Sequence, residues 1–284
     1  MRTLANLMNA LAIVVLGSAG LTSAAGAQSG STDLAKVSQN PIGNIVSLPL
    51  QNNTSFGIGP DNAMSNALNI QPVYPLSLSR KWNLVNRAIV PVIYRQEVVP
   101  GTGSAFGLGD ISYSGFVSPA QPGKVIWGVG PSLLFPTATE DRWSSDKWSA
   151  GVAVIALTMP GNWVVGGLVQ NVWSFAGDSA AADVNQMLFQ VILNYNLANG
   201  WYLTSTPTIV ANWEAPADNR WTVPVGGGAG KIMHWGSQPM DLQVQAFYNV
   251  ERPVPLAGQG VNLDNQGNTW TLRVQLKFLF PKGG

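Results

Sequence analysis

The chain has 284 residues, of which only 10% are charged, and its 15 Lys or Arg residues against 14 Asp or Glu residues give a formal net charge of +1. This balance argues against a nucleic-acid partner, which requires a basic surface. Because the chain contains 0 cysteines, a disulfide framework and a thiolate metal site are excluded.

Soluble domains usually carry about 25% charged residues, so this chain is poor in charge. Its mean hydropathy is nevertheless only slightly positive. No stretch after the N-terminus approaches the roughly 20 apolar residues of a membrane-spanning helix. Few charges without long apolar runs are typical of a transmembrane β-barrel, because its apolar residues occupy every second position of each strand.

The N-terminus has the features of a secretory signal peptide. Arg2 supplies a positive charge, residues 7–17 form a short apolar stretch, and Ala25-Gly26-Ala27 matches a small-residue cleavage site. We therefore expect a signal peptide over residues 1–27, cleaved near Ala27, and export of the mature chain. No cysteine follows the cleavage site, so a lipoprotein anchor is not expected.

Residues 28–50 are predicted to form a separate N-terminal segment. Residues 33–37 and 40–46 could make a short helix, with Asn40 as N-cap and Pro41 at the first helical position. Two interpretations stay open. The segment is either an ordered lead-in on the periplasmic side or a plug over a pore.

From Gln51 onward the chain divides into strand-length segments whose connections alternate strictly between short turns and long polar loops. In bacterial outer-membrane barrels the short turns face the periplasm and the long loops face the exterior. The sequence thus predicts an all-β fold over residues 51–284, a transmembrane antiparallel up-and-down β-barrel of about 12 strands. The expected strands are residues 51–59, 66–78, 82–96, 110–119, 124–136, 148–159, 162–175, 184–197, 200–213, 220–234, 240–251 and 269–280.

The last strand shows the alternation most clearly. Between Trp270 and Phe280 the even positions are all apolar, whereas the odd positions through Lys277 are polar. Only a β-strand places these two sets on opposite faces. Segments 148–159 and 162–175 are apolar on both faces. We expect them either to contact an interior plug or to line an apolar lumen.

Two groups of residues are candidates for function. The first lies on, or at the ends of, the predicted water-facing sides, where it would either set the charge preference of a pore or pair across the lumen. It comprises Arg87, Arg95, Asp110, Gln190, Asp241, Gln245, Glu251, Arg273 and Lys277. The second is predicted to anchor the barrel at the membrane interfaces. It comprises Trp82, Trp127, Trp163, Trp201, Trp213, Trp221 and Trp270.

Signals for catalysis are weak. His234 is the only histidine, lies at a predicted turn, and is not accompanied by a Gly-x-Ser-x-Gly motif. Residues 226–230 are rich in glycine but lack the Lys-Ser/Thr of a phosphate loop. In a strand we expect these glycines to relieve crowding. We therefore expect no enzyme activity, no catalytic residues, no metal site and no cofactor.

Several strings together resemble one family of bacterial outer-membrane proteins, the meta-pathway-of-phenol-degradation family, often labelled as transporters. The resemblance spans nearly all of the mature chain and implies uptake of small, hydrophobic or aromatic molecules, but no individual binding residue. It is carried by residues 51–57 (QNNTSFG), 69–73 (NIQPV), 82–84 (WNL), 91–94 (PVIY), 106–110 (FGLGD), 127–131 (WGVGP), 135–139 (FPTAT), 171–177 (NVWSFAG), 194–197 (NYNL) and 200–205 (GWYLTS).

The sequence-based hypothesis is thus a monomeric barrel in the bacterial outer membrane. Its partners are outer-membrane lipid and a small-molecule solute that passes through a narrow lumen. The alternative is a structural or adhesion-type barrel with a closed lumen and partner-binding loops. An outer-membrane enzyme that uses His234 is the third choice.

Overall fold

The computed structural model describes residues 27–59, 62–98, 101, 103–253 and 267–280, and the side chains from Asp33 onward. The predicted signal peptide lies outside the described residues except for Ala27. In the described part of the chain, no helix is long and apolar enough to cross a membrane.

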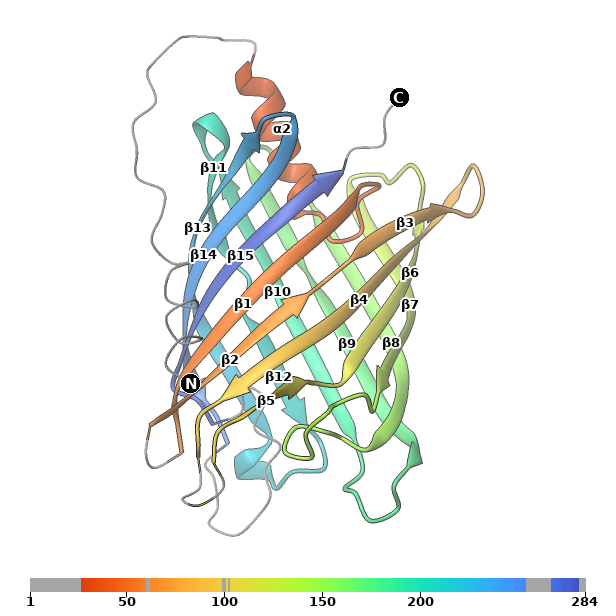
Figure 1. Ribbon diagram of the computed structural model, residues 1–284. Helices are drawn as coiled ribbons and strands as arrows, with labels where there is room; N and C mark the ends of the chain where they lie inside the picture. The colour runs from red at the N-terminus through yellow and green to blue at the C-terminus, as the bar shows by residue number, and fades with distance from the viewer. Residues whose placement is uncertain (1–26, 60–61, 99–100, 102, 254–266, 281–284) are drawn as a thin grey trace.

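The structure is a closed antiparallel β-barrel (Figure 1). Fifteen strands form one sheet, in which three are additional short pieces of a 12-stranded wall. The predicted fold class is therefore confirmed. The elements are α2 (Ala27–Gln39), β1 (Val46–Ile58), β2 (Ala63–Ile70), β3 (Val73–Ser77), β4 (Trp82–Arg95), β5 (Ala105–Leu108), β6 (Ile111–Pro119), β7 (Val125–Phe135), β8 (Lys147–Thr158), β9 (Trp163–Gly177), β10 (Asn185–Asn196), η2 (Ala198–Gly200), β11 (Trp201–Ser205), β12 (Thr208–Asn212), η3 (Ala217–Asn219), β13 (Trp221–Trp235), β14 (Gln238–Glu251) and β15 (Trp270–Phe280).

The first and last strands close the barrel. β1 and β15 pair antiparallel in unbroken register from Val46 opposite Phe280 to Phe56 opposite Trp270. This pairing satisfies the backbone N–H and C=O groups that would otherwise form a free sheet edge. Hydrocarbon offers such an edge no hydrogen-bond partner, so closure is the solution that a membrane requires.

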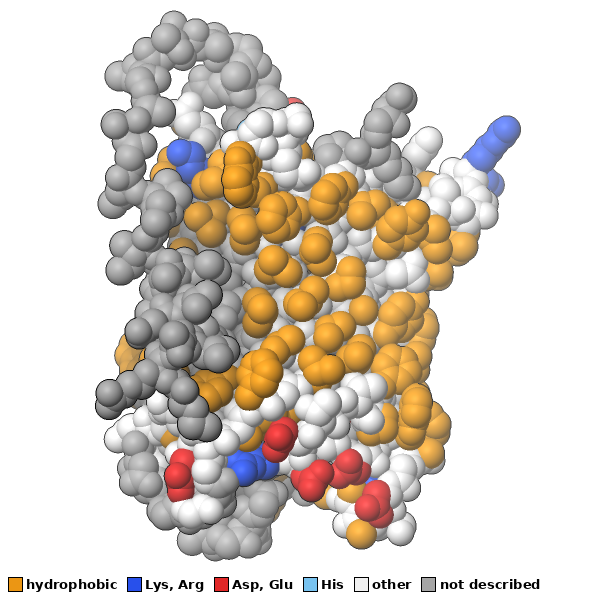
Figure 2. Space-filling view, viewed as in Figure 1, with side chains coloured by type: hydrophobic (Ala, Val, Ile, Leu, Met, Phe, Trp, Pro, Cys, Tyr) orange, Lys and Arg blue, Asp and Glu red, His pale blue; other side chains and the backbone are white. Residues whose placement is uncertain are grey.

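The side chains alternate between the two faces of the wall as the sequence predicted. On β15, Leu272 and Val274 are 40% and 38% exposed, whereas Arg273 and Gln275 are each 9% exposed. On the face of the barrel that Figure 2 shows, hydrophobic side chains cover the middle of the wall and acidic side chains gather at the long-loop end. The exterior is thus apolar and the interior largely polar, the reverse of a soluble barrel.

Two predicted strands are interrupted by proline. Segment 66–78 breaks between β2 and β3 at Pro72, and segment 200–213 breaks between β11 and β12 at Pro207. Proline has no backbone N–H to donate to the ladder. The preceding residues, Gln71 and Thr206, both line a cavity inside the barrel.

The N-terminal helix covers only the first part of the predicted stretch. α2 includes residues 33–37 but ends at Gln39, so the helix expected over residues 40–46 is not formed. Asn40 instead accepts a hydrogen bond from the Ile42 N–H at 3.1 Å, which forms a turn. Because Pro41 disfavours helical dihedrals at the preceding residue, the helix stops. β1 then begins at Val46, inside the segment predicted to precede the barrel.

The apolar interior faces of β8 and β9 contact this N-terminal segment. Ile42, which is 5% exposed, belongs to one buried cluster with Ile155, Leu157 and Leu168. Gly128 leaves room for it, since a Cβ there would lie 3.2 Å from Ile42 Cδ1. Of the two explanations for strands that are apolar on both faces, the structure supports contact with an interior segment.

Candidate functional site

The C-terminal end of α2 is bound to the barrel wall through a buried carboxylate. Ser38 Oγ donates to Asp241 Oδ2 at 2.5 Å, and the Tyr202 hydroxyl donates to the other carboxylate oxygen. Lys277 Nζ donates to the Ser38 carbonyl at 2.6 Å. Asp241 is 0% exposed. The carboxylate therefore connects the helix to β11 and β14, and Lys277 on β15 holds the last helical turn.

Gln39 forms a second connection. Its side-chain amide exchanges two hydrogen bonds with that of Asn196, at 2.9 and 3.2 Å. Nearby, Lys36 Nζ donates to the Gly161 carbonyl at 2.6 Å. Asn196 and Gly161 lie at the end of the barrel that carries the short turns, and Figure 1 shows α2 at the end where β15 finishes. α2 and the residues after it thus obstruct the short-turn mouth.

The tyrosine in this network depends on a glycine. At Gly230 on β13, a Cβ would lie 2.3 Å from Cζ of Tyr202. A side chain at position 230 would displace the ring from Asp241. Gly230 is one of the glycines of residues 226–230, which were expected to relieve crowding in a strand. Its contact with Tyr202 is an example of that role.

We expect Asp241→Asn to loosen α2 in the full chain. Hydrogen bonds to a charged group contribute about 1.5–3 kcal/mol, so the released form should become roughly tenfold to a hundredfold more populated. Limited trypsin digestion after Lys36, in detergent, measures this population. Asp183→Asn, the same chemical change in a long loop, is the control. Equal cleavage rates in the two variants would show that Asp241 does not hold the helix.

An inner cavity of about 100 Å³ lies between the N-terminal segment and the wall. Arg87 and Lys277 line it with several side-chain amides, and Ile45, Val73 and Ile192 supply apolar surface. No Asp or Glu is among the described residues that line it. The cavity is therefore cationic and amide-rich on one part of its surface and aliphatic on another.

An outer cavity of about 80 Å³ lies toward the long-loop end and is lined by Phe247, Asn249 and Arg273 among others. A polar layer separates the two cavities. Arg273 donates to Asn53 Oδ1 and to the Thr206 carbonyl, both at 2.9 Å, and Gln245 Nε2 donates to Thr206 Oγ1 at 3.0 Å. A solute that traversed the barrel would have to displace this layer and then α2.

The predicted water-facing residues fall into separate groups. Arg87, Gln190 and Lys277 line the inner cavity, Arg273 lines the outer one, and Gln245 belongs to the layer between them. Asp241 lies under the N-terminal helix. Arg95, Asp110 and Glu251 lie toward the long-loop end.

Arg95 and Asp110 contact loops rather than either cavity. The Arg95 guanidinium lies 5.7 Å from the ring centroid of Trp143, a loop residue that is 1% exposed. Asp110 accepts hydrogen bonds from the backbone N–H groups of Thr137 and Ser145, at 3.0 and 2.8 Å. Glu251 is exposed at the end of β14.

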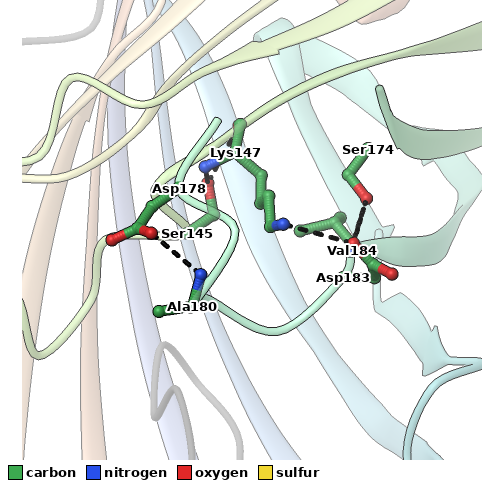
Figure 3. A network of polar contacts seen from close by, with 7 residues as sticks. All are labelled: Ser145, Lys147, Ser174, Asp178, Ala180, Asp183 and Val184. Atoms are coloured by element: carbon green, nitrogen blue, oxygen red, sulfur yellow. Dashed lines mark hydrogen bonds and ion pairs between the residues drawn. The ribbon is translucent and has the colours of Figure 1, made fainter. Parts of the chain in front are cut away.

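A second loop network joins β8 to the loop before β10 (Figure 3). Lys147 Nζ lies 3.3 Å from Asp183 Oδ1, which also accepts a hydrogen bond from Ser174 at 3.3 Å. Ser174 Oγ in turn accepts from the Val184 N–H at 3.0 Å. Asp183 is largely exposed, so this ion pair contributes little to stability and mainly orders the loop.

The predicted interface tryptophans occupy both ends of the wall. Trp82, Trp127, Trp163 and Trp201 lie near the short-turn end, whereas Trp213, Trp221 and Trp270 lie near the long-loop end. Several contact one another edge to face, such as Trp82 and Trp127 with ring centroids 5.9 Å apart and Trp213 and Trp221 at 5.5 Å. Trp148 and Trp173, 46% and 49% exposed, were not among the candidates.

The remaining candidate, His234, is exposed at the end of β13, and no described side chain forms a hydrogen bond with it. Among the described residues, no group of three or more His, Asp or Glu side chains could hold a metal.

Sequence reasoning did not identify the residues that complete the site. These residues lie in a helix, in strand breaks or in a strand, and none belongs to a distinctive motif. They are Ser38, Gln39, Gln71, Tyr202 and Thr206. Only Pro72 and Pro207, each directly after a polar residue within a predicted strand, could have indicated two of them.

Comparisons with solved structures find outer-membrane barrels. The chain is similar to an outer-membrane channel from Pseudomonas putida F1, with a TM-score of 0.62 and 15% identity over 83% of this chain and 94% of that one. A FadL homologue from Pseudomonas aeruginosa matches with a TM-score of 0.42 and 8% identity, over 83% and 89%. No family model and no curated protein matches the sequence. The fold is therefore that of outer-membrane β-barrels.

One similar structure corrects an expectation. Outer-membrane phospholipase A from Escherichia coli matches with a TM-score of 0.42 and 12% identity, over 83% of this chain and 96% of that one. An enzyme is thus found among barrels of this kind. The expectation of no enzyme activity is therefore wrong. It rested only on the absence of motifs, and a barrel fold does not exclude catalysis.

Proposed function

We propose that this chain is a channel of the Gram-negative outer membrane, through which small molecules pass by way of the barrel lumen. The observation that carries the proposal is the pair of interior cavities, in line along the barrel and separated by a side-chain layer. The similarity to the Pseudomonas putida channel supports it. The wall closes within one chain, which fits a monomer.

The finer parts of the hypothesis rest on the sequence. The resemblance to the meta-pathway-of-phenol-degradation family suggests small hydrophobic or aromatic solutes. The predicted signal peptide and the tryptophans at both ends of the wall fit insertion into the outer membrane. The size of the inner cavity fits a narrow path that a single side chain or helix can close.

A second candidate is a barrel with a permanently closed lumen whose loops bind a partner. The contacts of Ser38, Gln39 and Ile42 with the wall favour it, because they obstruct the short-turn mouth. Flux of phenol and benzoate into proteoliposomes separates the two candidates. The channel predicts faster flux than in protein-free vesicles. Flux equal to that of empty vesicles, even after α2 is deleted, favours the closed barrel.

A further inference from the structure

Three cations of the barrel interior, the buried Arg273 and the half-buried Arg87 and Lys277, have no ion pair among the described residues. In the described part of the chain, neither Arg87, Arg273 nor Lys277 lies within ion-pair distance of a carboxylate. Arg87 Nη2 donates to Gln71 Oε1 at 2.7 Å, and Lys277 donates to a backbone carbonyl. Neutral oxygens thus solvate these charges but do not balance them.

The three cations also act on one another. Arg87 interacts electrostatically with both Arg273 and Lys277. Asp241 is an opposing charge that attracts Lys277. Its oxygens, however, already accept hydrogen bonds from Ser38, Tyr202 and Gln243. Asp241 is not among the described residues that line the cavity, and the cavity surface carries an excess of positive charge.

Uncompensated charge away from bulk water is costly unless a counter-charge or hydrogen bonds stabilise it. An anion in the inner cavity would supply that counter-charge between Arg87 and Lys277. Amides of Gln190, Gln243 and Gln275, which also line the cavity, can donate to its oxygens.

The apolar part of the inner cavity favours an anion that also has an apolar body. Ile45, Val73 and Ile192 line it. Val73 and Ile192 belong to the buried apolar cluster of the barrel, which also includes Val85 and Phe116. A fully polar anion would leave this surface in contact with water, whereas an apolar body would cover it.

We propose that the inner cavity binds small amphipathic organic anions, a carboxylate held between Arg87 and Lys277 with its apolar body against Val73 and Ile192. This proposal rests on the proposed channel function and names its class of solute. The cavity is small, about 100 Å³, and this limits the apolar body to a single ring or a short chain.

The test is calorimetric titration of the full-length protein in non-ionic detergent with benzoate, its neutral isostere benzamide, and acetate, which lacks the ring. Benzoate should bind at least about tenfold more tightly than benzamide, which lacks the charge-assisted contact. It should also bind at least about tenfold more tightly than acetate, which lacks the buried ring. Arg87→Gln should weaken benzoate by a similar factor, and Arg87→Lys, which keeps the charge, should weaken it less. Lys231→Gln removes the same charge beside Trp201, away from both cavities, and should change nothing.

Absence of benzoate binding by the unmodified protein would overturn the proposal. So would benzamide or acetate binding as tightly as benzoate, or unchanged affinity in Arg87→Gln. Retained heat-modifiability on gels shows that each variant is folded. Benzoate flux into proteoliposomes is measured separately. Binding without flux contradicts the channel and leaves the site standing, whereas flux without binding contradicts the site alone.

Discussion

Deletion of residues 28–44 is expected to raise the conductance of single channels in planar bilayers severalfold and to abolish long closures. The deletion removes Ser38, Gln39 and Ile42, which connect the N-terminal segment to Asp241, Asn196 and the apolar cluster. β1 begins at Val46, so the pairing of β1 with β15 stays intact. The inner cavity then opens directly to the short-turn end.

A matched control is deletion of residues 28–32, which shortens the helix but keeps all three contact residues. This variant should conduct as the full chain does. If the longer deletion, folded by heat-modifiability, had the same conductance as the full chain, α2 would not be the obstruction. The polar layer around Arg273 would then be the controlling barrier.

The second large effect is expected from Val274→Arg. Val274 lies in the middle of β15 on its outward face and is 38% exposed. An arginine facing hydrocarbon near the bilayer midplane costs about 2–4 kcal/mol. Denaturant unfolding of the protein in lipid vesicles should show a loss of stability of this size.

Thr271→Arg on the same strand provides the comparison. Thr271 lines the outer cavity, where a guanidinium can remain hydrated, and accepts a hydrogen bond from Asn268 at 2.8 Å. Its replacement should cost only about 1 kcal/mol, the value of that bond. Equal costs at positions 271 and 274 would mean that the two faces of β15 meet the same medium.

The wall could be predicted from the sequence because its determinants are local. Alternation along Trp270–Phe280 depends on neighbouring residues and a period of two, and the turn residues separate the strands. The prolines at 72 and 207 could have predicted the two strand breaks, but the predicted strands run through them. Each breaks a strand, which a pattern of hydrophobicity alone does not register.

The interior could not be predicted in the same way. Ser38 and Asp241 are 203 residues apart, and nothing in either local sequence indicates that they meet. Arg95 and Asp110 satisfied the criterion of a charge at the water-facing side of a strand. They contact loops instead, because Trp143 and the backbone of residues 137–145 come close to them in the fold. Periodicity assigns a residue to a face but does not identify its partner.

In the proposed channel, lipid contacts one face of each strand while water reaches the other through the lumen. Because the chain contains 0 cysteines, single cysteines can be placed in turn at positions 271, 272, 274, 275 and 276. The measurement is the rate at which a small water-soluble thiol reagent labels each of them in proteoliposomes. We expect faster labelling at 271 and 275 than at 272, 274 and 276. Fast labelling at the even positions with slow labelling at the odd ones would contradict this expectation.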